Sequence, residues 1–454
     1  AGNGTIQNPY VIVNLENLYW VASDTANWNK NYIQVENIDA SATEEWFMGD
    51  HDGIPATPDE PMGWLSIGNN TVAFSGSYNG KGFSISNLFL NRPGSSWQGL
   101  FGKTNNALID SIDIQNANIA AADYVGGIVG FNRNTIVSNC KFAGIITGSA
   151  DVGSVIGNNG NSEIINCNSQ ADINANINIG GIVGFSTLAS ISNCHFSGIV
   201  SGEDYIGGLA GNISGSTVYQ SSAEGEIQGF SNLGGLIGKT QNNSIIEYCF
   251  SKNTVTGKDW YIGGLVGYNS GTDLNDCYSI TDVTGNSDIG GLIGNGNNNS
   301  TITNCYSAGS VSGTSFIGGL VGFAPSAAFN NCFWDLNTSS VDSSDGGIGK
   351  STDLMKNSST FLDAGWNGSV WYMDAEINDG YPYFWWQDSS GSPVSVGTNY
   401  ITKGMNFILF QNYPNPFNPA TTIKYSIPTP PASSPLAKGR TEVGFVTLKI
   451  YNLL

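Results

Sequence analysis

The strongest candidates for chemical reactivity in this 454-residue chain are its seven cysteines. All seven stand in one column of an internal repeat. Earlier copies place Leu88 and Ile112 in that column, and a later copy places Ser221 there. A position that accepts Leu, Ile and Cys is an inward apolar slot, where free Cys behaves as a small hydrophobic side chain. A zinc site needs ligands that converge from several directions, which a single row does not supply. We therefore expect a buried structural thiol ladder, with disulfides between adjacent copies as the alternative. The ladder consists of Cys140, Cys167, Cys194, Cys249, Cys277, Cys305 and Cys332.

The two histidines are the next candidates. His51 lies between Asp50 and Asp52 and could bind a metal ion, but the sequence favours a solvated loop. His195 follows Cys194, which is the order of a Cys–His nucleophile. The column of His195 varies too much for a catalytic position, and we expect it to be exposed while Cys194 points inward. Other copies hold Lys141, Asn168, Ser222, Phe250, Tyr278, Tyr306 and Phe333 in that column.

Acidic side chains could form the carboxylate pairs of a polysaccharide-degrading enzyme. In the repeats, however, the acids are scattered, and no cluster of Lys or Arg joins them. We therefore expect no catalytic residues and interpret the acids as surface solvation. The acids concerned are Glu163, Asp172, Glu203, Asp204, Glu224, Glu226, Asp273, Asp276, Asp282 and Asp288.

Oxygen-bearing side chains alternate just beyond the last repeat, at Asp335, Asn337 and Ser339, with Asp342 close behind. Calcium loops use such spacing, although this one lacks the glycine turn and the closing glutamate. The sequence allows a Ca²⁺ site here and indicates no other cofactor.

Four aromatic residues follow the cysteine column in consecutive copies: Phe250, Tyr278, Tyr306 and Phe333. The pattern predicts an outward stripe that could stack sugar rings or bind a partner. The alternative is that these side chains pack under the C-terminal part of the chain.

The element that must position all these residues is a repeat of about 27 residues. An apolar-Gly-Gly-apolar-apolar-Gly pattern ends at Gly130, Gly184, Gly211, Gly238, Gly267, Gly294 and Gly322, with looser versions at Gly102 and Gly157. The columns around it are apolar and mostly β-branched, and long helical periods are missing. The pattern predicts an all-β chain, a parallel β-solenoid (β-helix) of about nine coils with about three short strands each. The Gly pairs suit corners with positive φ or close backbone approach.

The regions outside the repeats predict caps at both ends and a separate C-terminal piece. Residues 1–80 form an N-terminal cap region, with a short amphipathic helix over Leu15–Ser23. Residues 81–345 hold the solenoid repeats, and the aromatic segment 346–387 forms a C-terminal cap. Residues 388–404 form a linker, and residues 405–454 a further domain.

The stretches GGIVGFN, GGLAGN, GGLIGK, GGLVGYN and GGLVGF resemble the GLUG motif repeats of bacterial surface and secreted proteins. The lead-in segments GTIQNPYVIVNLENLYWVAS and FSGSYNGKGFSISNL extend this resemblance over residues 4–387. It implies the solenoid architecture and no particular activity.

The C-terminal piece shows a second resemblance. The motif NYPNPFNP and the later strand LKIYN are similar to the sorting domain of the type IX secretion system. The insertion PTPPASSPLAKGRTEVG is long and later strands are absent, so the resemblance implies an incomplete β-sandwich. It also implies the secretion machinery as a partner, with release from the cell or attachment to its outer surface.

Charge and hydropathy set the remaining expectations. Lys and Arg number 16 against 36 acids, a net charge of −20, which disfavours nucleic acid and anionic lipid as partners. No apolar run is long enough to span a bilayer, and a start at Ala1 without Met suits a mature chain after signal-peptide removal.

These observations together predict a non-catalytic secreted or cell-surface protein. It would be a rigid, adhesin-like rod that contacts other surfaces or associates end to end into fibres. The alternative is a secreted carbohydrate-active enzyme or glycan-binding module with its site on one solenoid face.

Overall fold

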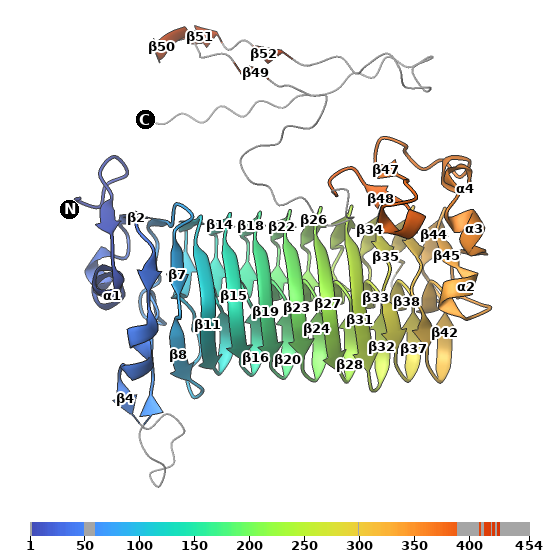
Figure 1. Cartoon of the computed structure of the whole chain (residues 1–454), viewed down its shortest axis with the longest axis horizontal. Coiled ribbons are helices and arrows are strands. Elements are labelled where there is room, and N and C mark those ends of the chain that lie inside the picture. The colour runs from blue at the N-terminus through green and yellow to red at the C-terminus, as the bar shows by residue number, and fades with distance from the viewer. Residues whose placement is uncertain are drawn as a thin grey trace. The chain divides into compact units, whose positions relative to one another are not determined.

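The computed structural model describes residues 2–49, 60–297 and 299–387, together with the backbone of four short strands between residues 408 and 426. Contacts divide the chain into two compact units, residues 1–395 and 396–454. The first unit is a stack of parallel strands wound into successive coils (Figure 1). The predicted parallel β-solenoid is therefore confirmed.

A typical coil contributes strands to four parallel ladders, and the first two ladders run nearly the whole length of the stack. The first sheet contains β1 (Tyr10–Ile12), β2 (Asn31–Gln34), β6 (Ser77–Asn79), β10 (Leu108–Asp110), β14 (Ile136–Ser138), β18 (Glu163–Ile165), β22 (Ser190–Ser192), β26 (Thr217–Tyr219), β30 (Ile245–Glu247), β34 (Asp273–Asn275), β39 (Thr301–Thr303) and β44 (Ala328–Asn330). The second sheet contains β3 (Ile38–Asp39), β7 (Ser84–Ser86), β8 (Phe89–Arg92), β11 (Asp113–Ala121), β15 (Lys141–Thr147), β19 (Asn168–Asn174), β23 (His195–Ser201), β27 (Ser222–Gly229), β31 (Phe250–Gly257), β35 (Tyr278–Ser279), β36 (Asp282–Thr284), β40 (Tyr306–Ser307), β41 (Val311–Ser312), β45 (Phe333–Asp335) and β46 (Ile348–Lys350).

The other two ladders lie on either side of the Gly pair of each repeat. The third sheet contains β12 (Asp123–Gly126), β16 (Ala150–Gly153), β20 (Ile177–Gly180), β24 (Asp204–Gly207), β28 (Ser231–Gly234), β32 (Trp260–Gly263), β37 (Ser287–Gly290) and β42 (Ser315–Gly318). The fourth sheet contains β9 (Phe101–Asn105), β13 (Val129–Arg133), β17 (Ile156–Gly160), β21 (Val183–Thr187), β25 (Ala210–Ser214), β29 (Ile237–Gln241), β33 (Val266–Ser270), β38 (Ile293–Asn297) and β43 (Val321–Phe323).

A typical coil therefore has four short strands, where the sequence predicts about three. The difference arises at the Gly pair, which bends the chain between a third-sheet and a fourth-sheet strand. A Cβ on Gly126 would lie 2.1 Å from the Val129 oxygen, and one on Gly127 would lie 2.2 Å from the Phe142 ring. Close backbone approach, the second of the two predicted reasons, accounts for this pair.

Positive φ, the first predicted reason for the Gly pairs, occurs at other residues. The residue before the cysteine column takes a left-handed conformation in successive coils, with φ of 54° at Asn139, 54° at Asn166 and 52° at Asn193. Asn tolerates this conformation better than most residues because its short amide bonds locally. The Asn166 Nδ2 group donates to Asn139 Oδ1 at 3.1 Å, so neighbouring corners also support each other.

The interior is lined by the apolar columns that the repeat predicts. Ile164 and Ile191, for example, are register partners in the first sheet, and both are fully buried. The interior also contains a polar row in the fourth sheet. There the Asn132 Nδ2 group donates to Asn159 Oδ1 at 2.8 Å, and both side chains are fully buried.

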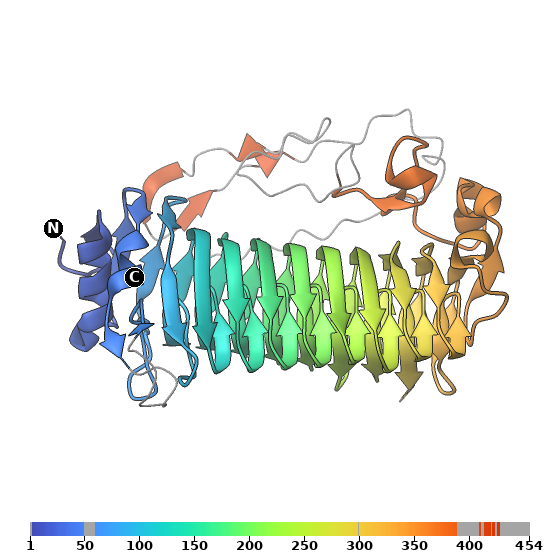
Figure 2. The ribbon, with the colours of Figure 1, turned by 60° about the horizontal axis from the view of Figure 1, so that its bottom comes forward.

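The N-terminal helix α1 (Leu15–Ser23) has the bounds that the sequence predicts. Asn14 caps it by accepting a hydrogen bond from the Asn17 amide at 2.9 Å, and Leu18, Val21 and Ala22 are buried. Figure 2 shows α1 at the end of the stack, but β1, β2 and β6 already pair in the first sheet, so the ladders begin before residue 81. The remaining N-terminal elements are η1 (Thr25–Asn27), η2 (Ser41–Glu45), β4 (Met48–Gly49) and β5 (Glu60–Pro61).

Beyond β45 the chain leaves the repeat. The elements of this region are α2 (Leu336–Ser339), α3 (Thr352–Met355), α4 (Ser358–Leu362), β47 (Trp371–Tyr372), η3 (Asn378–Gly380) and β48 (Tyr383–Phe384). In the second unit, β49 (Ile408–Leu409) pairs antiparallel with β52 (Tyr425–Ser426), and β50 (Tyr413–Asn418) with β51 (Ala420–Thr422). The predicted linker 388–404 and the β-sandwich packing of residues 405–454 lie outside the described residues.

Candidate functional site

The aromatic stripe of Phe250, Tyr278, Tyr306 and Phe333 is buried, so its prediction as an exposed ligand-binding surface is wrong. The four side chains are between 0% and 4% exposed. They do point away from the coil interior and stack on one another, with the rings of Phe250 and Tyr278 5.0 Å apart and nearly parallel. A second hydrophobic cluster covers them, built from Met355, Phe361, Trp366, Trp371, Tyr381 and Phe384.

The C-terminal segment 346–387 therefore lies along the side of several coils rather than only across the last one. The Tyr306 hydroxyl donates to the Pro382 oxygen at 2.6 Å, and the ring of Trp386 stacks on Phe250 at 5.5 Å. The alternative interpretation of the stripe, packing under the C-terminal part of the chain, is the one observed.

The predicted calcium ligands do not form a cation site. Asp335 is fully buried and caps α2, accepting hydrogen bonds from the amides of Asn337 and Thr338 and from the hydroxyls of Thr352 and Tyr381. Asn337 Oδ1 accepts from the Thr352 amide at 2.9 Å.

The other two predicted ligands lie apart from this network. Ser339 is buried and its hydroxyl donates to the Leu336 oxygen, while Asp342 is exposed. The side-chain oxygens of Asp335 and Asn337 therefore stabilise the N-terminus of α2 and bind the following segment at Thr352. Within the described ranges, no three His, Cys, Asp or Glu side chains come together to hold a metal ion.

The thiol ladder is present as predicted. All seven cysteines are buried and free. Each thiol lies near the carbonyl two residues earlier, as in Cys249, whose Sγ donates to the Glu247 oxygen at 3.1 Å. Burial raises the pKa of the Cys140, Cys249 and Cys305 thiols, which suppresses the reactive thiolate at these positions. Hydrogen bonds with neighbouring thiols lower the pKa of Cys167 and Cys277, and full burial keeps reagents away from all of them.

His195 is more enclosed than predicted, and it does not act on Cys194. Its Nδ1 atom lies 2.9 Å from the Ser222 hydroxyl in the next coil, and burial lowers its pKa from 6.5 to about 4. Cys194 points into the core from the adjacent position, so the two side chains face opposite sides of the strand. His51 and its flanking aspartates lie outside the described residues.

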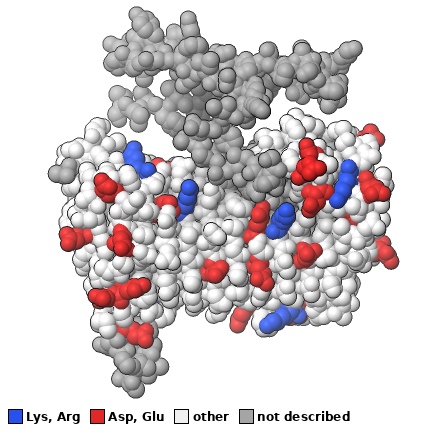
Figure 3. Space-filling view, in the orientation of Figure 1, with Lys and Arg blue, Asp and Glu red and all other residues white. Residues whose placement is uncertain are grey.

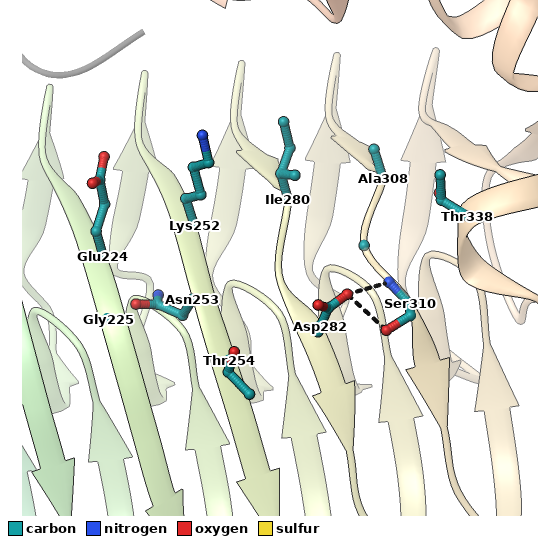
Figure 4. A pocket seen from close by; sticks show the side chains of 11 residues that line it. Glu224, Gly225, Lys252, Asn253, Thr254, Ile280, Asp282, Ala308, Ser310 and Thr338 are labelled. Atoms are coloured by element: carbon teal, nitrogen blue, oxygen red, sulfur yellow. Dashed lines mark hydrogen bonds between the residues drawn. The ribbon is translucent and has the colours of Figure 1, made fainter. Parts of the chain in front are cut away.

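A groove on the outer face of the second sheet is the candidate site that the structure adds (Figure 4). It is an open depression of about 720 Å³ that crosses four coils beside α2. Its lining consists of Glu224, Gly225, Lys252, Asn253, Thr254, Ile280, Asp282, Ala308, Gly309, Ser310 and Thr338.

Strand register brings charged groups of both signs into this groove. Glu224 and Lys252 are register partners on β27 and β31. Asp282 lies on β36, where its Oδ1 atom accepts from the Ser310 amide at 2.9 Å and from the Ser310 hydroxyl at 2.7 Å. An arrangement of this kind can bind a polar ligand with hydroxyl groups.

Lys252 was not predicted as the cation next to these acids. Aligning the copies would have placed it one coil from Glu224, because both residues stand three positions after the cysteine column. Elsewhere the acids are scattered along the coils, and on the face seen in Figure 3 acidic side chains are spread over the surface with fewer basic ones among them.

Among the described residues, no helix is both long and apolar enough to cross a membrane. The model of the GLUG motif matches residues 121–147, 175–201, 231–256 and 259–284. Over 150 residues the chain is 34% identical to halomucin of Haloquadratum walsbyi. The aligned region is 33% of this chain and 2% of halomucin. Over 140 residues it is 33% identical to a protein of Evansella cellulosilytica described provisionally as a Gly-rich membrane protein. The aligned region is 30% of this chain and 15% of that protein.

A solved structure from Bacteroides ovatus, described provisionally as an immunoglobulin A1 protease, aligns with a TM-score of 0.37 at 17% identity. The alignment covers 85% of this chain and 95% of that one. The chain spans only a small part of the curated relatives that it matches. Each matched segment coincides with one coil of the stack, and the chain carries GLUG motif repeats that fold as a parallel β-solenoid.

Proposed function

We propose that this protein is a non-catalytic, adhesin-like structural rod, secreted or held at the cell surface, that makes contacts through its lateral faces. The observation that carries the proposal is the unbroken parallel ladder from β1 to β44, whose interior is packed in every coil. Such a ladder resists bending because each coil shares backbone hydrogen bonds with both neighbours. A stiff rod suits holding surfaces at a fixed separation.

The relatives support a place at or outside the cell surface, since they are named halomucin and a Gly-rich membrane protein. The resemblance of residues 407–454 to a type IX sorting domain supplies a route of export. End-to-end association into fibres is a variant of the same function, because terminal strands of a solenoid can pair with another chain.

Negative-stain imaging and adhesion measurements on the purified chain test this function. We expect rods that bind cells or extracellular matrix and that leave a panel of polysaccharides intact. Reproducible depolymerisation of any polysaccharide would overturn the non-catalytic assignment, and rods that bind no surface would overturn the adhesin role.

A second candidate function, a carbohydrate-active or glycan-binding site, is favoured by the groove at Glu224, Lys252 and Asp282. Glu224→Gln and Asp282→Asn should then abolish any turnover or binding of glycans at this face. Glu226→Gln is the matched control because Glu226 lies on the same strand, outside the groove lining.

A further inference from the structure

Between β13 and β43, one outward column of the fourth sheet consists mainly of aromatic and amide side chains, which alternate except at Lys239. Strand register pairs each member with the next. This alternating column consists of Phe131, Asn158, Phe185, Asn212, Lys239, Tyr268, Asn295 and Phe323. The aromatic rings on either side of Asn158, and those on either side of Asn295, are two coils apart, roughly 10 Å along the stack.

The rings stand above the amides between them. Phe323 is 37% exposed and the other three rings are partly exposed, whereas Asn158, Asn212 and Asn295 are 6%, 7% and 6% exposed. The chain thus presents aromatic ridges with polar recesses between them along one side of the stack.

A second aromatic residue of the same coil reinforces most ridges. The ring of Tyr124 lies 5.5 Å from Phe131, that of Tyr261 lies 5.2 Å from Tyr268, and that of Phe316 lies 5.3 Å from Phe323. Phe316 is 59% exposed, so this last ridge is open to solvent.

The recesses repeat the same chemistry at two distant places. Asn158 Nδ2 donates to Asp151, and Asn295 Nδ2 donates to Asp288 Oδ1 at 2.8 Å. Asn158 Oδ1 and Asn212 Oδ1 accept no hydrogen bond from any described residue. Buried amide oxygens are normally paired, so these two are acceptors whose hydrogen bonds are left for a ligand hydroxyl or a water molecule.

We propose that the alternating column binds an extended neutral polysaccharide along the rod. Aromatic rings pack on the apolar faces of sugars, and amide and carboxylate oxygens accept hydrogen bonds from sugar hydroxyls. A β-1,4-linked chain presents the same ring face at every second residue. That repeat is close to the two-coil spacing within the pairs Phe131/Phe185 and Tyr268/Phe323; Phe185 and Tyr268 are three coils apart, so each pair is a separate binding segment.

Charge argues for a neutral ligand. The net charge of −20 and the carboxylates of Asp151 and Asp288 repel anionic polymers. The cations at the column already face aromatic rings. The Nζ atom of Lys239 lies 5.0 Å from the centre of Tyr205, and Arg133 and Lys103 lie 3.9 Å and 5.1 Å from the centre of Phe131. This proposal rests on the contact function above and specifies the ligand class of one lateral face.

Native affinity electrophoresis of the full chain in hydroxyethyl cellulose, a soluble neutral β-1,4-glucan, tests the proposal. We expect the polymer to retard the protein and polygalacturonate to leave its mobility unchanged. The double variant Tyr268→Ala/Phe323→Ala should bind at least about tenfold more weakly, since two stacked rings are lost. Tyr372→Ala, which removes a 46% exposed ring from β47, is the matched control and should bind normally.

The single variant Phe316→Ala separates a loss of binding from a loss of folding, because the Phe316 ring is mostly exposed. It should weaken binding several-fold and leave the thermal midpoint unchanged. Equal retardation of the wild type and the double variant, or no retardation by the glucan, overturns the proposal. If the wild type still adheres to cells in that case, the adhesin function stands and only the ligand class fails. Binding lost equally in Tyr372→Ala also overturns it, because the contact would then lie elsewhere.

Discussion

The side chains of Tyr278 and Gln387 form a buried hydrogen-bonded pair although they are 109 residues apart in the chain. The Gln387 Nε2 group lies 2.9 Å from the Tyr278 hydroxyl, and the Gln387 Oε1 atom also accepts from the Phe384 amide at 2.7 Å. The pair therefore joins a repeat strand to the end of the C-terminal segment, and it fixes that segment on the side of the stack.

Removing an aromatic ring beneath this segment should loosen it. Tyr306→Ala deletes a fully buried ring and the hydrogen bond to Pro382, and we expect a loss of about 3 to 5 kcal/mol in unfolding free energy. Urea unfolding followed by tryptophan fluorescence measures the loss, because Trp366 and Trp371 contact this ring.

Tyr372→Ala is the control for Tyr306→Ala, since its ring is 46% exposed, and it should change the unfolding free energy by less than about 0.5 kcal/mol. Similar losses in both variants would contradict the structural role assigned to the covered stripe.

The periodic part of the fold could be predicted from the sequence because every coil repeats one pattern of inward side chains. Cys277 stands where Ile112 and Leu88 stand, and all three are fully buried. The helix at Leu15–Ser23 was also predictable, because its cap and its apolar face are local in sequence.

The burial of Tyr278 could not be predicted with the same certainty, because the residues that cover it come from a non-repeating segment. A column of outward side chains has the same sequence pattern whether the side chains face water or are covered by a distant segment of the chain. The alternating column at Phe131 was missed for another reason. Its members differ from copy to copy, as Phe131, Asn158 and Lys239 do, and a variable column gives the same sequence pattern as an ordinary solvated surface.

The partly buried His195 should make stability depend on pH in a defined window. Its pKa is about 4 in the folded chain and 6.5 in the unfolded one, so between these values the unfolded state binds more protons. The contribution of His195 is complete above pH 6.5 and falls as the pH drops towards 4, by up to about 3 kcal/mol.

The variant His195→Asn isolates this contribution, because Asn168 occupies the equivalent position of the neighbouring coil. Urea midpoints measured across this pH range should fall less steeply for the variant than for the wild type, with His51 present in both. Parallel curves for the two proteins would show that His195 titrates normally.

The thiol ladder should be chemically silent until the chain unfolds. Ellman's reagent should label essentially none of the seven thiols in the native protein and all seven in concentrated guanidinium without reductant. Fewer than seven in denaturant would reveal disulfides between adjacent coils, which is the alternative that the sequence left open.

The variant Cys277→Ser should still fold. Ser221 already stands in the same column, where its hydroxyl donates to the Tyr219 oxygen at 2.9 Å. We expect a cost of about 1 kcal/mol for the more polar group, measured by urea unfolding.

Asp335 should act as a structural carboxylate and not as a calcium ligand. Its carboxylate accepts from two amides of α2 and from the hydroxyls of Thr352 and Tyr381. Asp335→Ala leaves these donors without their acceptor in a buried place, so we expect a loss of about 3 kcal/mol and faster proteolysis of residues 346–387. Asp342→Ala is the matched control: its side chain is exposed, so stability should barely change.

Addition of calcium or of a chelator should leave the thermal midpoint of the wild type unchanged. A calcium-dependent rise that Asp335→Ala abolishes would instead assign a cation to this carboxylate, and the hydrogen bonds around it would then have to rearrange on binding.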